Sequence, residues 1–180
     1  MTKILAINGS LRKGSFNQAV LDAAADLAPD HMNIVMHPLD DVEPFNEDLE
    51  DNPPAGAKAL IAAAKDADGI LIGNPEYNHS LTGVLKNALD WLSRPSAGQP
   101  LKDLPAMPVG ASPGPVGTAR AHAHLRVVAW TIGMRLWPGP EVLVGNCKDK
   151  IEDGKLTDEE ARKFLKKSLG AFEEWIERLG

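Results

Sequence analysis

One segment near the start of the chain sets the architecture: Ile4-Leu5-Ala6-Ile7-Asn8-Gly9-Ser10-Leu11-Arg12-Lys13-Gly14-Ser15-Phe16-Asn17. The unbroken apolar run at 4–7 is typical of a strand that is covered on both faces of a parallel sheet. A polar loop of small residues follows, and from 16 to 28 the apolar side chains recur at helical spacing. A strand, a tight loop and a helix in this order direct free N–H groups and the positive helix end at one point. We therefore expect an anion site in this loop.

The rest of the chain repeats the strand–helix alternation. The fifth strand is expected in two pieces, because Pro138-Gly139-Pro140 interrupts it, and Pro108 is an awkward residue inside the fourth. A capping box at 157–160 precedes the last helix, whose expected core face includes Phe164. The expected strands are 3–7, 33–39, 69–75, 107–111 and 135–137 with 142–144, and the expected helices are 16–28, 55–67, 83–93, 119–132 and one that ends near 179. This alternation predicts an open α/β sheet with helices on both faces.

Composition narrows the class of protein. A length of 180 residues fits one domain, and a net charge of −6 argues against nucleic-acid or anionic-membrane partners. The single cysteine, Cys147, excludes an internal disulfide and favours a cytoplasmic location. No apolar stretch approaches the roughly 20 residues of a membrane span, and the first apolar run is too short for a signal peptide.

Three loops of small and polar residues, at 8–17, 74–82 and 111–118, follow expected strands. Right-handed crossovers bring such loops to one sheet edge, where ligands bind in open α/β folds. The first loop is not a nucleoside-triphosphate loop, since Ser15 stands where that motif needs lysine. The dinucleotide fingerprint G-x-G-x-x-G is also absent, and only Asp40 loosely fits its acidic ribose-binding residue.

The side chains of the first loop suit a terminal monophosphate. Ser10, Ser15 and Asn17 offer hydrogen bonds, and Arg12 supplies a positive charge. In the second loop, Tyr77 can cover a flat ring, and the third loop lets a planar ligand approach its backbone. Flavin mononucleotide (FMN) fits this combination. The alternatives are that the first loop only makes a tight turn, and that the tyrosine only plugs the core.

The three loops also carry a family resemblance. The segment 9–17 resembles the phosphate loop of the NAD(P)H-dependent FMN reductases of flavodoxin-like fold, a group that includes bacterial quinone, chromate and azo-dye reductases. The segments 75–78 with 83–91, and 112–114 with Arg120, are similar to its other two signatures. The family usually has proline where Thr82 stands. The resemblance implies a single flavodoxin-like domain over 1–180, a three-layer sandwich whose five-stranded parallel sheet has the order 2-1-3-4-5.

The resemblance also implies a non-covalent FMN site, with NADPH or NADH as hydride donor. The residues implied at the phosphate are Ser10, Arg12, Ser15, Phe16 and Asn17. Those implied along the ring are Pro75, Glu76, Tyr77 and Asn78 on one side, with Ser112 and Gly114 on the other. The electron acceptor would be a small molecule such as a quinone, azo dye, chromate or ferric chelate. A homodimer or homotetramer is expected, and no acid–base residue or metal ligand is assigned.

Two other functions stay open at this point: a one-electron carrier of the flavodoxin type, and a flavin-free module that binds a phosphorylated metabolite. The choice between NADPH and NADH is also open, and so are roles for His79 and Cys147. We expect His79 to lie in a solvent-exposed loop and Cys147 to be a buried or inert thiol. His122 and His124, with two neighbouring arginines, are compatible with a basic helix face, a subunit contact or a solvated surface.

Overall fold

The computed structural model describes residues 1–179. Its main sheet is parallel, with the strand order β2-β1-β3-β4 and a fifth position that β5 and β6 share beside β4. The strands are β1 (Thr2–Asn8), β2 (Met32–His37), β3 (Gly69–Gly73), β4 (Pro105–Ala111), β5 (Arg135–Leu136) and β6 (Val142–Val144). This arrangement confirms both the predicted order 2-1-3-4-5 and the predicted split in the last strand.

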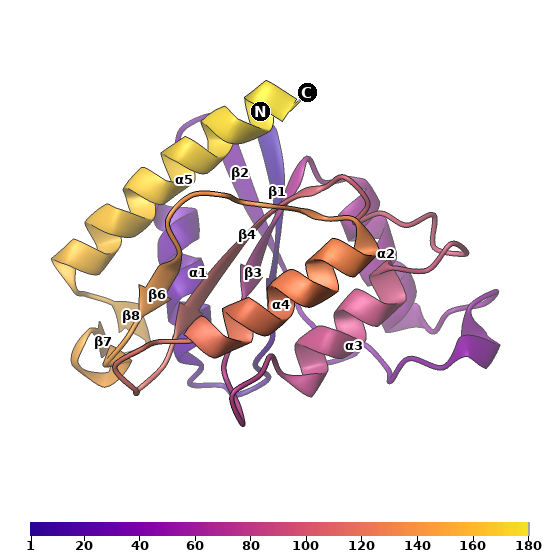
Figure 1. The fold of residues 1–180 in the computed structure, drawn as a ribbon, viewed down its shortest axis with the longest axis horizontal. Helices are drawn as coiled ribbons and strands as arrows, with labels where there is room; N and C mark the ends of the chain where they lie inside the picture. The colour runs from indigo at the N-terminus through magenta and orange to yellow at the C-terminus, as the bar shows by residue number, and fades with distance from the viewer. Residues whose placement is uncertain (180) are drawn as a thin grey trace.

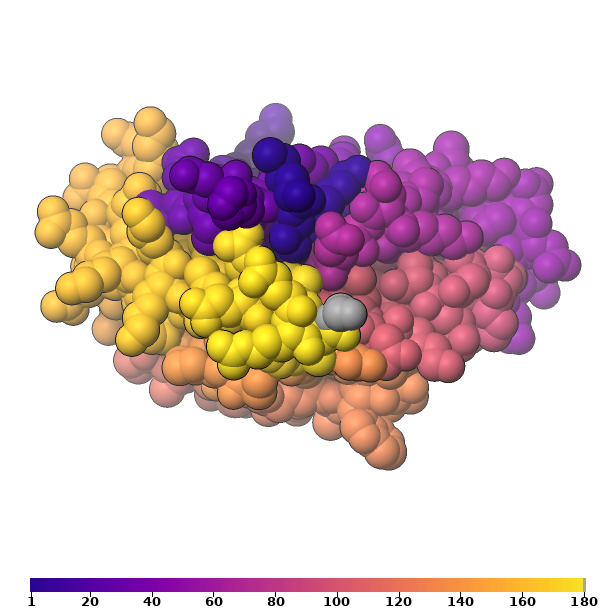
Figure 2. Space-filling model, turned by 90° about the horizontal axis from the view of Figure 1, so that it is seen from above, coloured from indigo at the N-terminus to yellow at the C-terminus, as the bar shows by residue number. Residues whose placement is uncertain are grey.

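Helices cover both faces of the sheet (Figure 1). On one face lie α1 (Phe16–Leu27) and α5 (Glu159–Leu179), and on the other lie α2 (Ala55–Lys65), α3 (Gly83–Leu92) and α4 (Ala119–Ile132). Short 3₁₀ turns occur at Glu47–Leu49 and Cys147–Asp149. The first and last segments of the chain lie side by side, as Figures 1 and 2 both show. Within residues 1–179, no helix combines the length and the apolar character that crossing a membrane would need.

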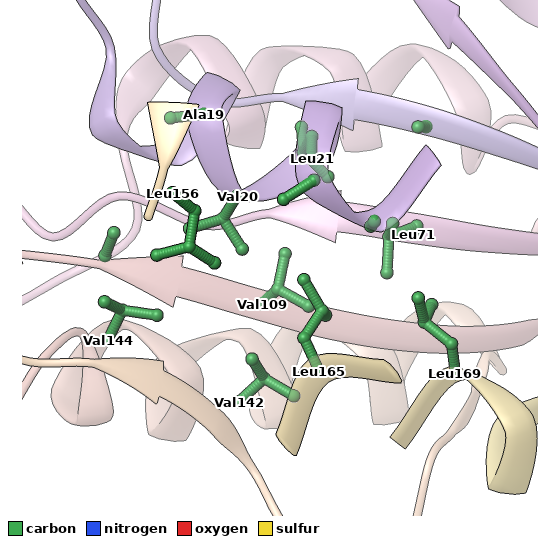
Figure 3. Packing of buried hydrophobic residues seen from close by; sticks show 14 of the residues in the cluster. Ala19, Val20, Leu21, Leu71, Val109, Val142, Val144, Leu156, Leu165 and Leu169 are labelled. Carbon is green, nitrogen blue, oxygen red and sulfur yellow. The ribbon is translucent and has the colours of Figure 1, made fainter. Parts of the chain in front are cut away.

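The alternation of side chains along each strand builds two cores. Along β1, Ile4 and Ala6 face α1 and α5, whereas Leu5 and Ile7 face α2 and α3. Figure 3 shows the first core, where side chains of α1, β3, β4, β6 and α5 interdigitate. Because both faces of β1, β3 and β4 are buried, these inner strands are mostly apolar, as the sequence indicated.

Pro108 is tolerated inside β4 because of the gap between β5 and β6. The Asn74 N–H donates to the Val109 carbonyl on the β3 side, and the Trp137 N–H donates to the Ala106 carbonyl on the other side. Residues of a parallel strand bond alternately to its two neighbours, so the proline nitrogen points to the β5/β6 side. There β5 pairs only with residues 105 and 106, and β6 only with 109–111. The missing N–H therefore breaks no ladder bond.

The structure differs from the sequence-based prediction at four points in β4 and the C-terminal part. A small antiparallel hairpin, β7 (Ile151–Glu152) and β8 (Lys155–Leu156), was not predicted, and β4 begins at 105 rather than 107. Asp158, not Thr157, caps α5 by accepting from the Ala161 N–H at 2.8 Å. The threonine hydroxyl instead donates to the Lys150 carbonyl and closes the hairpin. Phe164 is 40% exposed and does not belong to the core face of α5.

Candidate functional site

A cavity of about 230 Å³ lies at the carboxyl edge of β1, β3 and β4. It is lined by all three predicted loops, which the parallel sheet brings together as expected. Its lining residues are Ser10, Arg12, Ser15, Phe16, Asn17, Pro75, Glu76, Tyr77, Ala111, Ser112 and Pro113. Every predicted site residue is among them except Asn78 and Gly114, which lie one position beyond the lining at the tips of their loops.

The first loop meets the requirements of a phosphate cradle. Ser15 caps α1 by accepting from the Gln18 N–H at 3.3 Å, and its own carbonyl accepts from Ala19. The N–H groups of Phe16 and Asn17 are left without an intrahelical acceptor, as at any helix start. The first turn of α1 has no acidic residue, so nothing there repels an anion.

Arg12 stands beside this helix start. Its guanidinium lies over the Phe16 ring, 4.8 Å from the ring centroid, which holds the charge next to the free N–H groups. A side chain at Gly14 would come within 3.2 Å of the same guanidinium, so glycine leaves room for it. The donors and the charge together fit the phosphate of FMN.

The Asn17 side chain also has a structural task. Its amide donates to the Ala111 carbonyl at 3.1 Å and accepts from the Ala111 N–H at 3.0 Å. Both groups are buried, so the side chain ties α1 to the end of β4. The main-chain N–H of this residue has no intrahelical acceptor and is available to a phosphate. The sequence could not indicate this pairing across 94 positions.

Thr82 positions two of the loops, a role that the sequence analysis did not assign to it. Its buried hydroxyl donates to the Gly9 carbonyl at 2.7 Å and accepts from the Leu85 N–H at 3.2 Å, which caps α3. A Cβ at Gly9 would meet Pro75 Cδ at 2.9 Å and the threonine hydroxyl at 3.0 Å. The first and second loops are thus in close contact, and one side chain fixes their relative position. Its place before a helix was the signal for a cap.

Glu76 lines the cavity, and its carboxylate binds the start of α4. The side chain is 5% exposed and accepts from the N–H groups of Arg120 (3.0 Å) and Ala121 (3.2 Å) and from the Arg120 guanidinium. Burial raises the pKa of this carboxyl, but the bonds from the two N–H groups and the arginine outweigh it and leave the pKa below its usual value. The carboxylate is therefore a cap that fixes the second loop to α4.

The rest of the second loop is a tight turn with an exposed ring. Tyr77 and Ser80 exchange backbone hydrogen bonds at 3.0 and 3.1 Å, and Asn78 and His79 between them have φ of 51° and 62°. The Tyr77 side chain is 57% exposed, so it does not plug the core. His79 lies exposed at the tip, as expected, and the Ser80 hydroxyl contacts His124 Nδ1 at 2.9 Å.

The third loop is held by the segment that follows β6. The Ser112 N–H donates to the Val144 carbonyl, and its carbonyl accepts from Cys147. The Gly114 carbonyl accepts from the Asn146 N–H at 3.1 Å. A Cβ at Gly145 would come within 2.2 Å of the Pro115 carbonyl oxygen, so the two segments need glycine to approach. The expectation that the cysteine is buried is confirmed.

His122 does not lie on the surface, so a basic helix face, a subunit contact and a solvated surface are all wrong for this residue. It is 1% exposed and packs between α4 and the sheet, with Nδ1 3.7 Å from Glu141. Burial lowers its pKa, and the nearby Arg126 acts in the same direction. Glu141 and the Val109 carbonyl oppose them without reversing the shift. The ring is therefore neutral near pH 7. Arg126 lies outside and binds the same glutamate at 2.7 Å.

The model of the family described as NADPH-dependent FMN reductase matches residues 2–149. The chain belongs to this family. An NAD(P)H-dependent FMN reductase of Pseudomonas aeruginosa is 39% identical to it over 180 residues, which cover 98% of this chain and 96% of that protein. A 2-hydroxy-1,4-benzoquinone reductase of a Burkholderia species is 36% identical over 175 residues, covering 97% and 96%.

Solved structures of FMN reductase type share the fold. The flavoenzyme FerB of Paracoccus denitrificans, an NAD(P)H:(acceptor) oxidoreductase, superposes with a TM-score of 0.91 at 32% identity and covers 100% of both chains. The apo form of the NADH:FMN oxidoreductase EmoB gives a TM-score of 0.72 at 22% identity, over 96% of this chain and 88% of that one. The latter likeness concerns the fold alone.

Proposed function

We propose that this member of the FMN reductase family is an oxidoreductase that binds FMN without covalent attachment and reduces it with NADPH or NADH. The chain acts as one FMN-binding domain over residues 1–180. The observation that carries the proposal is the phosphate cradle: Arg12 beside the N–H groups of Phe16 and Asn17, with no carboxylate in the first turn of α1. This cradle adjoins a cavity bordered by Tyr77 and Ser112.

Each loop has a distinct task in this proposal. The residues that hold the phosphate are Ser10, Arg12, Ser15, Phe16 and Asn17, the last two through main-chain N–H groups. Backbone from Pro75 to Asn78 borders one edge of the ring, with Ser112 and Gly114 at the other. FMN, when bound, would supply the redox chemistry, namely hydride transfer from NADPH or NADH and electron transfer to an acceptor. The protein contributes position and charge, so no side chain is needed as an acid or base.

The electron acceptor in this proposal is a small molecule. The relatives of this chain include an enzyme named 2-hydroxy-1,4-benzoquinone reductase. A quinone is accordingly the first acceptor to test, followed by azo dyes, chromate and ferric chelates. The exposed Tyr77 leaves the entrance to the ring site open for donor and acceptor in turn.

We further propose a homodimer or homotetramer in the cytoplasm. On α4, Trp130 is 85% exposed and Val127 66% exposed, one turn apart on the same face. Large apolar side chains that gather on one helix face are common at protein interfaces. Sedimentation equilibrium with the wild type and Trp130→Ala would test this part by itself.

FMN reconstitution tests the site. Arg12→Ala should raise the Kd for FMN about tenfold or more, because a charge-assisted hydrogen bond contributes about 1.5–3 kcal/mol. Arg178→Ala, at an exposed arginine on α5, is the matched control and should leave the Kd unchanged. Quenching of FMN fluorescence measures both. Equal FMN affinity of the wild type and the Arg12 variant would contradict the proposal.

A further inference from the structure

A second cavity, of about 490 Å³, lies on the other side of the phosphate loop. Ser10 and Arg12 line both cavities, so the two are neighbours. The first cavity extends over β3 and β4, whereas the second extends over the end of β2 and the segment 36–40. In a sheet of order β2-β1-β3, the phosphate loop that follows β1 therefore stands between them. A ligand that crosses this loop would reach from one cavity into the other.

The lining of the second cavity is chemically mixed. Met36, Pro38 and Leu39 provide apolar surface at the end of β2. Lys13 and Arg12 supply two cations on one side, and the exposed Asp40 supplies a carboxylate on the other. The cavity is much larger than one phosphate needs, and its lining suits a ligand with a flat base, hydroxyl groups and phosphates.

His37 also lines this cavity without adding charge. Burial lowers its pKa, so the ring is neutral near pH 7. Asn8 and Gln18 form part of the wall, but the two side chains hydrogen-bond to each other at 3.0 Å. The charged groups that can select a ligand are therefore those of residues 12, 13 and 40.

We propose that this cavity binds the adenosine diphosphate half of NADH. The inference rests on the proposed function, which requires a nicotinamide over the ring site in the first cavity. The remainder of the dinucleotide then passes over the shared Arg12, which has enough donors to serve two phosphate groups. Lys13 and Arg12 bind the diphosphate, and the apolar surface of 36–39 receives the adenine.

The carboxylate of Asp40 determines whether the cavity prefers NADH or NADPH. The Asp40 carboxylate, at the edge of this cavity, can accept hydrogen bonds from the hydroxyls of the adenosine ribose. The additional 2′-phosphate of NADPH would meet this negative charge and be repelled. The cavity therefore favours NADH.

The test uses ADP-ribose, which is NADH without its nicotinamide, and calorimetric titration of the FMN-loaded protein. Lys13→Ala should raise the Kd for ADP-ribose about five- to tenfold. Asp40→Asn should raise it by a similar factor, and should leave 2′-phospho-ADP-ribose unchanged or tighter. Lys167→Ala on α5 and Asp26→Asn on α1 change matched exposed charges away from the cavity, and should alter neither Kd.

Unchanged ADP-ribose affinity in both Lys13→Ala and Asp40→Asn would overturn the inference. The inference would also be overturned if ADP-ribose displaced FMN and did not compete with NADH, because the cavity would then be part of the flavin site. In either case, the proposed function would still hold if NADH reduces the FMN-loaded protein. A protein that binds no FMN would instead refute the proposed function itself.

Discussion

Replacing Thr82 by valine removes the hydroxyl that joins the first two loops while keeping the shape of the side chain. Loss of a helix cap costs about 1 kcal/mol. The buried Gly9 carbonyl, which now accepts from the hydroxyl at 2.7 Å, would lose its partner at a further cost of about 1–2 kcal/mol. We expect Thr82→Val to lower the free energy of unfolding by about 2–3 kcal/mol. For a chain of this length, Tm falls by about 5–10 °C.

Equilibrium urea denaturation followed by circular dichroism, at matched flavin content, measures this change. Thr82→Ser is the control, because it keeps the hydroxyl and loses only a methyl group. It should retain most of the stability, and it should retain FMN better than the valine variant does. A valine variant as stable as the serine variant would refute the claim that the hydroxyl fixes the two loops.

Two further predictions concern other buried groups. Asn17→Ala leaves both backbone groups of Ala111 without their side-chain partner. It should therefore lower the free energy of unfolding by about 2–4 kcal/mol and weaken FMN binding. If urea denaturation shows a loss below about 1 kcal/mol, the side chain does not have this role. His122 has a lowered pKa in the folded protein, so the unfolded chain takes up a proton first, near pH 6.5. The stability that neutral His122 contributes is fully present above that pH, and it is lost as the pH falls toward the pKa of the ring in the folded protein. His122→Leu should flatten this part of the stability profile, and identical profiles between pH 7 and 5 would contradict the assignment.

Local patterns predicted the order of elements, the split fifth strand and the meeting of three loops. These follow from strand hydrophobicity, from Pro138-Gly139-Pro140 and from the handedness of crossovers, all of which act over short stretches of chain. Some of the residues that line the first cavity, such as Ser10, Arg12 and Ser15, were predictable from their hydrogen-bonding groups and charge after a strand, whereas others, such as Phe16 and Ser112, were implied only by the family resemblance.

The partners of the polar side chains were not predictable. The side chains of Asn17 and Glu76 bind backbone 94 and 44–45 positions away, contacts that the sequence did not indicate. Such pairs depend on tertiary packing, which no local pattern encodes. The tolerance of Pro108 was not predictable for the same reason, because it depends on a gap in a neighbouring strand that is distant in sequence.

The central claim is that this protein holds FMN where a nicotinamide can reduce it. Anaerobic titration of the FMN-reconstituted protein with NADH and with NADPH tests it most directly. We predict stoichiometric bleaching of the visible flavin band, faster with NADH, and recovery of the band when a quinone is added. A protein that gains no FMN, or whose bound FMN keeps its visible band with both donors, would contradict the account.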